Sequence, residues 1–233
     1  MNTDCGKTAA AVGFDLDLTL FDTRPAIRAV LRSTSAALRF EVDVDRVMRT
    51  LGPPLEDLLA EQLPVADART FAALYRADYA AHGHRYALLL PGVREAIAAV
   101  RGGGERVIVV TGQSERTARA HLTHERLEAD TVTGSVWGPG KTEVLVSLNA
   151  TVYIGDHPAD IAAARAAGAY AVAVTTGRHG AGELAAADLV LTSLHEFARW
   201  WEMRAAPFKR CPSAFERPAG KTDRTPRAIQ GEP

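Results

Sequence analysis

Two aspartates, Asp15 and Asp17, flank a leucine in the stretch FDLDLTLFD, directly after a short apolar segment. Two more, Asp156 and Asp160, follow the apolar segment TVYI at a spacing of four, which would place them on one face of the next helix. Carboxylates that converge on one point repel one another strongly unless a cation lies between them. Oxygen-only ligands favour a hard ion, so these residues predict an Mg²⁺ site if the fold brings them together.

The elements that would bring them together are short apolar strands alternating with helices. Strands are predicted at 9–14, 106–111, 130–133, 151–155, 170–174 and 188–191. Such strands, separated by helices, indicate a parallel sheet covered on both faces. Ligands bind outside the carboxyl ends of these strands, where Asp15, Thr111-Gly112 and Asp156 stand. The predicted fold class is a doubly wound, Rossmann-like α/β core.

The gap between the first two strands is filled by a helical segment. Thr23 can cap a first helix, further helices are expected at 55–63 and 66–82, and Gly52-Pro53-Pro54 should break the run. The predicted organisation is a core at 1–21 and 88–202, an all-helical cap inserted after the first strand at 22–87, and a flexible tail at 203–233. The tail gathers seven basic and three acidic residues with no periodicity.

Composition excludes several classes of protein. The 233 residues are 47% hydrophobic with a net charge of -1, which argues against a polyanion-binding surface and hence against a nucleic-acid partner. Cys5 and Cys211 lie near opposite termini, so a disulfide framework or zinc site is not expected. No signal-peptide segment and no run of about 18 apolar residues is present, so no membrane partner is predicted and a cytoplasmic location is expected.

Three motifs carry a family resemblance when taken together and in order. FDLDLTL resembles the DxDx(T/V) nucleophile motif of the haloacid dehalogenase-like hydrolases, VVTG looks like their second motif, and GDHPAD is similar to their GDxxxD motif. Lys141 in GPGKTEVL is the best candidate for the lysine that this family places between the last two motifs. LGPPLEDLL and LLLPGVREAIAAV look like the phosphoglycolate phosphatase-like branch, and the helical insert is similar to the family's C1 cap. The resemblance covers residues 11–200.

The resemblance implies roles for the candidate residues. Asp15 would attack phosphorus and form an aspartyl-phosphate, and Asp17 would protonate the leaving alkoxide and then activate water. Thr111 and the Gly112 N–H would bind phosphate, and Lys141 would stabilise charge. Asp156 would ligate magnesium directly. Asp160 would bind the metal through water or orient Lys141, and Asp17 would offer the metal its backbone carbonyl.

These roles imply a magnesium-dependent phosphatase acting on a small phosphorylated metabolite, such as a phosphoglycolate-type monoester. A phosphomutase of the β-phosphoglucomutase type and a non-catalytic binding protein on the same fold remain alternatives. Among the cap arginines Arg24, Arg28 and Arg49, Arg24 is the candidate ligand for a substrate carboxylate or phosphate. Oligomeric state stays open.

One position departs from the family pattern. Leu18 stands where the family commonly has glycine, and a leucine held at positive φ would be strained by roughly 1 kcal/mol or more. His157, next to Asp156, is expected to be a loop residue near the entrance rather than a metal ligand, and Trp200-Trp201 should pack the last helix onto the core.

Overall fold

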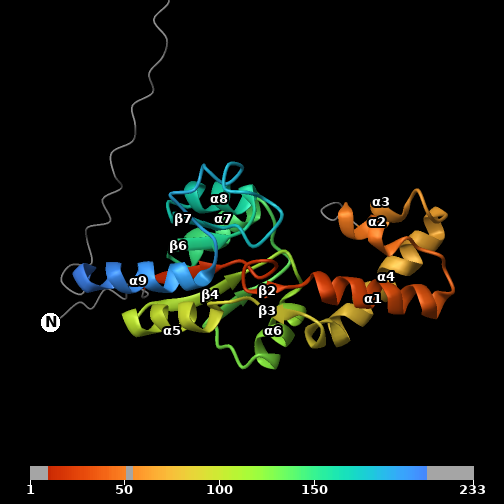
Figure 1. The fold of residues 1–233 in the computed structure, drawn as a ribbon, viewed down its shortest axis with the longest axis horizontal. Helices are drawn as coiled ribbons and strands as arrows, with labels where there is room; N and C mark the ends of the chain where they lie inside the picture. Colours follow the sequence, from red (N-terminus) through yellow and green to blue (C-terminus); the bar gives the residue numbers. More distant parts are fainter. Residues whose placement is uncertain (1–9, 51–54, 209–233) are drawn as a thin grey trace, which may run out of the picture.

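The centre of the molecule is a parallel sheet of six strands (Figure 1). The structure, a computed structural model, describes residues 10–50 and 55–208, with side chains through Arg204. The strand order is β5-β4-β1-β6-β7-β8, and each neighbouring pair is parallel. The strands are β1 (Ala11–Phe14), β4 (Arg106–Val110), β5 (Thr131–Thr133), β6 (Ala150–Gly155), β7 (Tyr170–Val174) and β8 (Leu189–Leu191). The predicted doubly wound α/β core is thereby confirmed.

Helices cover both faces of this sheet because successive strand residues point to opposite sides. In β4, Val107 and Val109 belong to one apolar cluster, together with residues of α5 (Val93–Gly103) and α9 (Leu194–Phe208). Ile108 and Val110 belong to another, with residues from helices on the opposite face. Those helices are α7 (Pro139–Ser147) and α8 (Pro158–Ala166), and α6 (Glu115–His124) joins the first cluster. Figure 1 shows α5 with α9, and α7 with α8, on opposite sides of the strands.

A group of helices inserted between β1 and β4 projects from one end of the sheet (Figure 1). They are α1 (Arg24–Leu38), α2 (Val44–Arg49), α3 (Leu55–Leu59), α4 (Val65–His82) and the 3₁₀ helix η1 (Gly83–Arg85). The four α-helices share a separate apolar cluster that includes Leu31, Val47 and Phe71. We refer to this group as the cap. It occupies the position of the predicted helical insert.

Some local features of the cap were not predicted. The short helix α2 begins where Asp43 accepts a hydrogen bond of 2.9 Å from the Arg46 N–H. Thr23 is the N-cap residue of α1, but its side chain makes no capping hydrogen bond, so the predicted side-chain cap is wrong. The chain enters and leaves the cap through β2 (Phe21–Asp22) and β3 (Leu88–Leu89), which pair antiparallel. The predicted break at 52–54 lies outside the described residues.

The last helix differs from its predicted boundary. α9 continues through Phe208, so residues 203–208, predicted to begin the flexible tail, are helical. Trp201 is buried and Trp200 partly buried against the core, as predicted. The rest of the predicted tail, and both cysteines, lie outside the described residues. No helix in the described part of the chain combines the length and apolar character needed to cross a bilayer.

Leu18 has a positive φ of 55°, which is the condition under which a leucine here would be strained. Its N–H donates to the Phe21 carbonyl at 2.7 Å, and its own carbonyl accepts from the Thr176 hydroxyl, so the turn is held in this conformation. We expect Leu18→Gly to be more stable than Leu18→Ala by about 1 kcal/mol, because both remove the side chain and only glycine relieves the strained φ. Urea denaturation of the two variants measures the difference. An alanine variant as stable as the glycine variant would contradict it.

His121 of α6 lies fully buried where the cap meets the core. Its ring centroid is 5.3 Å from that of Phe21 and 6.0 Å from that of Tyr79. Neither ring nitrogen has a hydrogen-bond partner among the described residues. Burial, aided by the charges of His84 and His124, lowers the pKa of His121 to about 4. The folded protein therefore holds this imidazole neutral at pH values where the unfolded chain would protonate it.

This depressed pKa predicts a loss of stability in acid. Below pH 6.5 the unfolded chain binds a proton that the folded protein does not, until the pH reaches about 4. The free energy of unfolding should therefore fall across this window by about 3 kcal/mol through His121 alone. Buried carboxylates with raised pKa values make the free energy of unfolding rise as the pH falls. The test therefore compares its pH dependence in the metal-free wild type and in metal-free His121→Leu, which share these carboxylates. We expect a flatter acid limb in the variant, and parallel curves would contradict the assignment.

Candidate active site

The carboxyl ends of three adjacent strands meet at one edge of the sheet. Asp15 follows β1, Thr111 follows β4, and Asp156 follows β6, with β1 between the other two. The Asp15 N–H donates to the Ile154 carbonyl at 2.8 Å, which continues the pairing of β1 with β6 beyond the strand. The predicted convergence at this edge is thus present.

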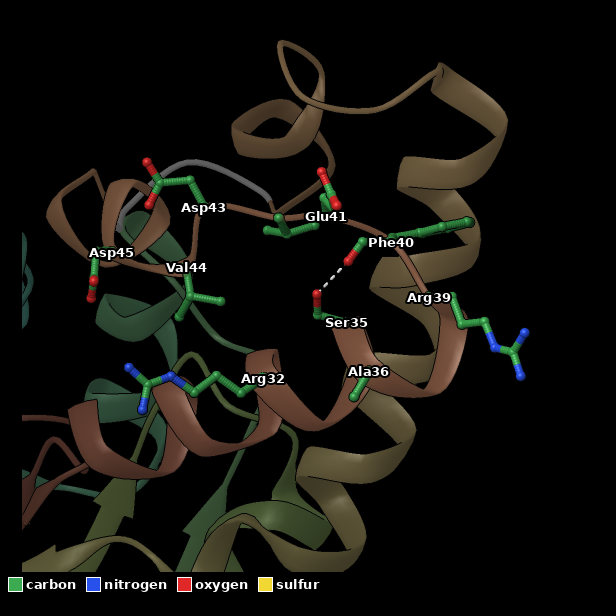
Figure 2. A pocket seen from close by; sticks show the side chains of 10 residues that line it. Arg32, Ser35, Ala36, Arg39, Phe40, Glu41, Asp43, Val44 and Asp45 are labelled. Carbon is green, nitrogen blue, oxygen red and sulfur yellow. Dashed lines mark hydrogen bonds between the residues drawn. The ribbon is translucent and has the colours of Figure 1, made fainter.

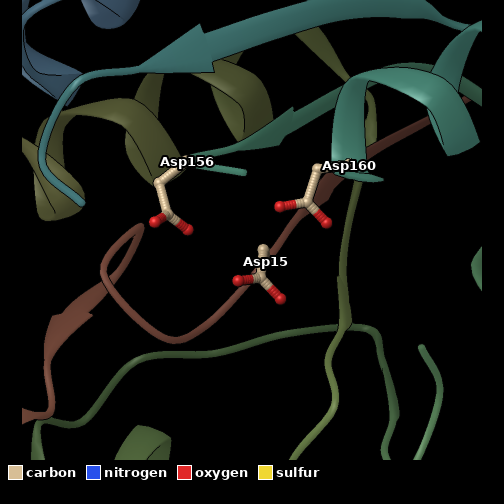
Figure 3. A group of neighbouring side chains, drawn as sticks. All are labelled: Asp15, Asp156 and Asp160. Carbon is tan, nitrogen blue, oxygen red and sulfur yellow. The ribbon is translucent and has the colours of Figure 1, made fainter. Parts of the chain in front are cut away.

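Three carboxylates face a common space at this edge (Figure 3). Asp15, Asp156 and Asp160 offer oxygen atoms that all lie within 4.8 Å of one another. The prediction that Asp156 and Asp160 share a helical face is wrong, because Asp156 lies in the loop before α8 and His157 is the N-cap residue. Asp160 reaches the cluster from the first turn of α8, where its carboxylate also accepts the His157 N–H at 3.3 Å.

Glycines allow this close approach. A Cβ atom at Gly155 would lie 2.4 Å from the Asp160 side chain, and one at Gly177 would lie 1.9 Å from the Asp156 carboxylate. Neither position has room for a larger residue unless an aspartate of the cluster moves. The glycine in GDHPAD is therefore a requirement of packing.

The cluster has the electrostatics of a cation site. Burial, with the neighbouring Asp160, raises the pKa of Asp15 to about 6 even though Lys141 acts to lower it. Burial, Asp15 and Asp160 raise the pKa of Asp156 to about 8. Because all the donors are carboxylate oxygens that disfavour one another's charge, a hard divalent cation such as Mg²⁺ fits this group.

Lys141 lies beside the cluster and is almost completely buried. Its Nζ donates to Asp15 Oδ1 at 2.8 Å and to Asp160 Oδ1 at 2.7 Å, from the first turn of α7. Burial works to lower its pKa, but the charge of Asp15, followed by Tyr153 and Asp160, raises it above its ordinary value. The lysine is therefore a fixed positive charge that holds one oxygen of Asp15.

Asp17 is half-buried and held by a residue that sequence reasoning missed. Its Oδ1 accepts a hydrogen bond of 2.5 Å from Gln113 Nε2, which also lies 3.4 Å from the Tyr79 hydroxyl. Burial and the charge of Asp15 raise the pKa of Asp17 to about 6. The Asp17 side chain is not part of the three-carboxylate cluster. Its predicted contribution to the metal through the backbone stays a prediction.

The two predicted phosphate-binding residues occupy different surroundings. Thr111 is completely buried, and its hydroxyl accepts the Gln113 N–H at 3.2 Å. Gly112 lines the cavity, as do Gln113 and Ser114. In the loop after β4, Gly112 therefore lines the cavity that contains the carboxylates. Thr111 does not line it and instead supports the loop through its bond to the Gln113 N–H.

A cavity of about 870 Å³ joins this edge of the sheet to the cap. Core residues such as Asp15 and Asp156 and cap residues such as Tyr75 line it together. Arg24 lines it as well, but its guanidinium is held by Asp22 through contacts of 2.7 and 2.9 Å. The predicted recognition of a substrate carboxylate by Arg24 would have to compete with this ion pair.

Of the other two predicted cap arginines, only one lines the cavity. Arg49 lines the cavity from α2, whereas Arg28 is not part of its wall and pairs with Asp45. His157 caps α8 by accepting the Ala159 N–H at 3.0 Å, in agreement with its prediction as a loop residue.

Sequence reasoning also missed the aromatic residues around the cavity. Tyr75 and Tyr79 stand four residues apart on α4, a spacing that places both on one helical face, and Trp137 stands four residues before Lys141. The helical spacing was a usable signal for the two tyrosines. For Trp137 and Gln113, the only signal in the sequence was their closeness to Lys141 and Thr111, respectively.

A second hollow, of about 600 Å³, lies on the cap between the end of α1 and the start of α2 (Figure 2). Its polar groups serve the local fold: Ser35 donates to the Phe40 carbonyl and Asp43 caps α2. Asp45 pairs with Arg28. This hollow therefore has the character of a structural junction rather than a reaction site.

Comparison with known proteins agrees with this geometry. A family model described as haloacid dehalogenase-like hydrolase matches residues 12–174. The phosphoglycolate phosphatase of Chromobacterium violaceum is 29% identical over 216 residues, covering 82% of this chain and 95% of that protein. A solved haloacid dehalogenase-like family hydrolase from Streptococcus pneumoniae superposes with a TM-score of 0.68 at 22% identity, covering 83% of this chain and 98% of the other.

A third relative matches over a shorter stretch. Tyrosine-protein kinase PtkA of Mycobacterium tuberculosis is 32% identical over 124 residues, which is 53% of this chain and 43% of PtkA. The chain thus spans less than half the length of this relative. The family model alone covers well over half of the chain, with strands β4 to β7, the cap and the three carboxylates inside its limits. The chain belongs to the haloacid dehalogenase-like hydrolases.

Proposed function

We propose that the protein is an Mg²⁺-dependent phosphatase that hydrolyses a small phosphate monoester through an aspartyl-phosphate on Asp15. The observation that carries this proposal is the pair of hydrogen bonds from Lys141 Nζ to Asp15 and Asp160, at 2.8 and 2.7 Å, beside three converging carboxylates. Lysine holds one oxygen of Asp15 and leaves the other for attack on phosphorus.

The chain supplies a nucleophile and a proton carrier. An oxygen of Asp15 attacks phosphorus, the bond from phosphorus to the ester oxygen breaks, and the departing oxygen takes a proton from Asp17. A pKa near 6 keeps part of the Asp17 population protonated close to neutral pH. Asp17 then takes a proton from water, whose oxygen attacks phosphorus and releases inorganic phosphate and Asp15.

The remaining residues hold charge. Asp15, Asp156 and Asp160 would hold the metal, which when bound neutralises negative charge on the phosphoryl group. Lys141, which contacts Asp15, stabilises the same charge, and the Gly112 N–H binds a phosphate oxygen. Thr111 orders this loop through its bond to the Gln113 N–H.

The substrate is a small ester, since the cavity of about 870 Å³ is bounded by both core and cap. The phosphoglycolate phosphatase among the relatives makes phosphoglycolate the first ester to test. Arg24 can bind the carboxylate of phosphoglycolate only if its ion pair with Asp22 is broken.

Phosphate release from a panel of esters, with Mg²⁺ and with chelator, tests the proposal. The panel includes phosphoglycolate and esters with aliphatic and aromatic leaving groups. Release that requires Mg²⁺ is expected. A folded, Mg²⁺-supplied protein that hydrolyses no ester would contradict it, and isomerisation of a sugar phosphate without phosphate release would instead favour the phosphomutase alternative.

A further inference from the structure

Trp137 is an exposed aromatic residue in the wall of the cavity. Its side chain is 62% exposed although it lines the same space as Asp15 and Asp17. Large aromatic side chains at concave sites commonly supply contact area to a ligand. None of the roles assigned above to the carboxylates, Lys141 and Gly112 uses this ring.

Backbone hydrogen bonds fix the loop that carries Trp137 to the loop after β4. The Ser135 N–H donates to the Gln113 carbonyl at 2.6 Å, and the Val136 N–H donates to the Thr111 carbonyl at 3.0 Å. A Cβ atom at Gly112 would lie 3.5 Å from the indole of Trp137. The backbone that carries Trp137 is therefore fixed, and the ring lies against the glycine whose N–H we assign to phosphate binding.

The ring also borders the reacting groups. Lys141 Nζ lies 5.7 Å from the centroid of the indole, and the His157 ring centroid lies 5.3 Å from it. A phosphoryl group at Asp15 would thus have its leaving group within reach of Trp137. The face of an indole is apolar, so it suits contact with an apolar leaving group rather than with the charged phosphoryl oxygens.

Much of the cap's contribution to the cavity is apolar or aromatic. Ile27, Met48 and Tyr75 line it from the cap, and Leu18 lines it from the turn after β1. Of the four arginines in the cavity wall, Arg24 pairs with Asp22 and Arg76 pairs with Glu56 through two contacts of 2.7 Å. The other two are Arg49 and Arg178. A leaving group that presents an apolar surface fits the apolar part of these walls.

We propose that the cavity accepts phosphate monoesters whose leaving group is a planar aromatic alcohol, and that Trp137 selects this group by packing against its ring. This inference rests on the proposed function, because it places the phosphoryl group at Asp15. The aromatic ring lies offset or edge-on against the indole, and the apolar side chains of the cap cover its other side. A small aliphatic leaving group would leave the indole uncovered.

Binding of phosphonates to the full-length, Mg²⁺-supplied protein tests this selection without turnover. The probes are methylphosphonate, benzylphosphonate and cyclohexylmethylphosphonate, in which carbon replaces the ester oxygen; the last two have similar size but only one is aromatic. Calorimetry should give about tenfold tighter binding of the benzyl than of the cyclohexylmethyl compound. Benzylphosphonate should also change the tryptophan fluorescence.

Matched substitutions assign the preference to Trp137. The ratio of the two affinities should stay largely intact in Trp137→Phe, which keeps an aromatic ring, and should fall towards one in Trp137→Leu. The fluorescence change should disappear in both variants. Because Trp137 is mostly exposed, thermal unfolding should change little in either variant, and this is checked alongside.

The outcomes separate this inference from the function on which it rests. Equal affinities in the wild type, or an aromatic preference that persists in Trp137→Leu while methylphosphonate still binds, would overturn the role of Trp137 and leave the phosphatase proposal standing. Failure of all three phosphonates to bind would overturn the phosphoryl site, and the inference with it.

Discussion

Asp15→Asn should abolish phosphate release, with a loss on the order of 10⁴-fold or more, because an amide oxygen cannot form the aspartyl-phosphate. The substitution preserves the shape of the side chain, and its amide oxygen can still accept the Lys141 hydrogen bond now made by Asp15 Oδ1. It also removes a charge that raises the pKa of the neighbouring Asp156. The metal-free variant should therefore fold at least as stably as the wild type.

A matched control separates loss of the nucleophile from loss of a charge. Asp57 is exposed on α3 of the cap and lies outside the cavity wall, so Asp57→Asn makes the same chemical change away from the site. Steady-state phosphate release and thermal unfolding are measured for both variants. Residual activity in Asp15→Asn within tenfold of the wild type, in a preparation free of wild-type protein, would rule out Asp15 as the nucleophile.

Asp17→Asn should split the reaction into a fast first step and a slow second one when acetyl phosphate is the substrate. Acetate departs without a proton, so phosphoryl transfer to Asp15 can proceed, whereas attack by water on the aspartyl-phosphate lacks its base. A burst of acetate close to one equivalent per enzyme is expected, followed by steady turnover reduced by about 10²–10⁴-fold. Rapid-quench assay of acetate measures both phases.

Leaving-group dependence provides the control for this result. With an alkyl ester, whose departing oxygen needs the Asp17 proton, the same variant should be slow without a burst. The hydrogen bond from Gln113 can be kept by the asparagine carbonyl, so the local structure should persist. Wild-type steady-state rates with acetyl phosphate in Asp17→Asn would show that Asp17 does not activate the water.

The core of the fold could be predicted because its signals are local. Most strands of the sheet are short apolar runs, and the polar residues at the strand ends identified the edge that carries the carboxylates. β2 and β3 escaped prediction because two-residue strands carry no periodicity, and they form through pairing between residues almost seventy positions apart. The helix α2 was marked only by its cap at Asp43.

Within the site, residue types were easier to predict than contacts. The aspartates were predicted because they interrupt apolar sequence. Lys141 was predicted because it lies between two motifs. The shared hydrogen bonds of Lys141 depend on how α7 and α8 pack, and the bond from Gln113 to Asp17 joins residues 96 positions apart. Arg24 illustrates the reverse case, because a partner two residues away, Asp22, engages the group that was expected to meet the substrate.

Direct identification of the phosphorylated residue tests the central claim. Asp17→Asn supplied with Mg²⁺ and acetyl phosphate is quenched in acid during the burst, digested, and mapped by mass spectrometry, with Asp15→Asn treated in parallel. The mechanism predicts a phosphoryl group on the peptide containing Asp15, at the Asp15 side chain, and none in the parallel sample. A phosphoryl group on another residue, or acetate release in a burst with no phosphorylated peptide, would contradict it.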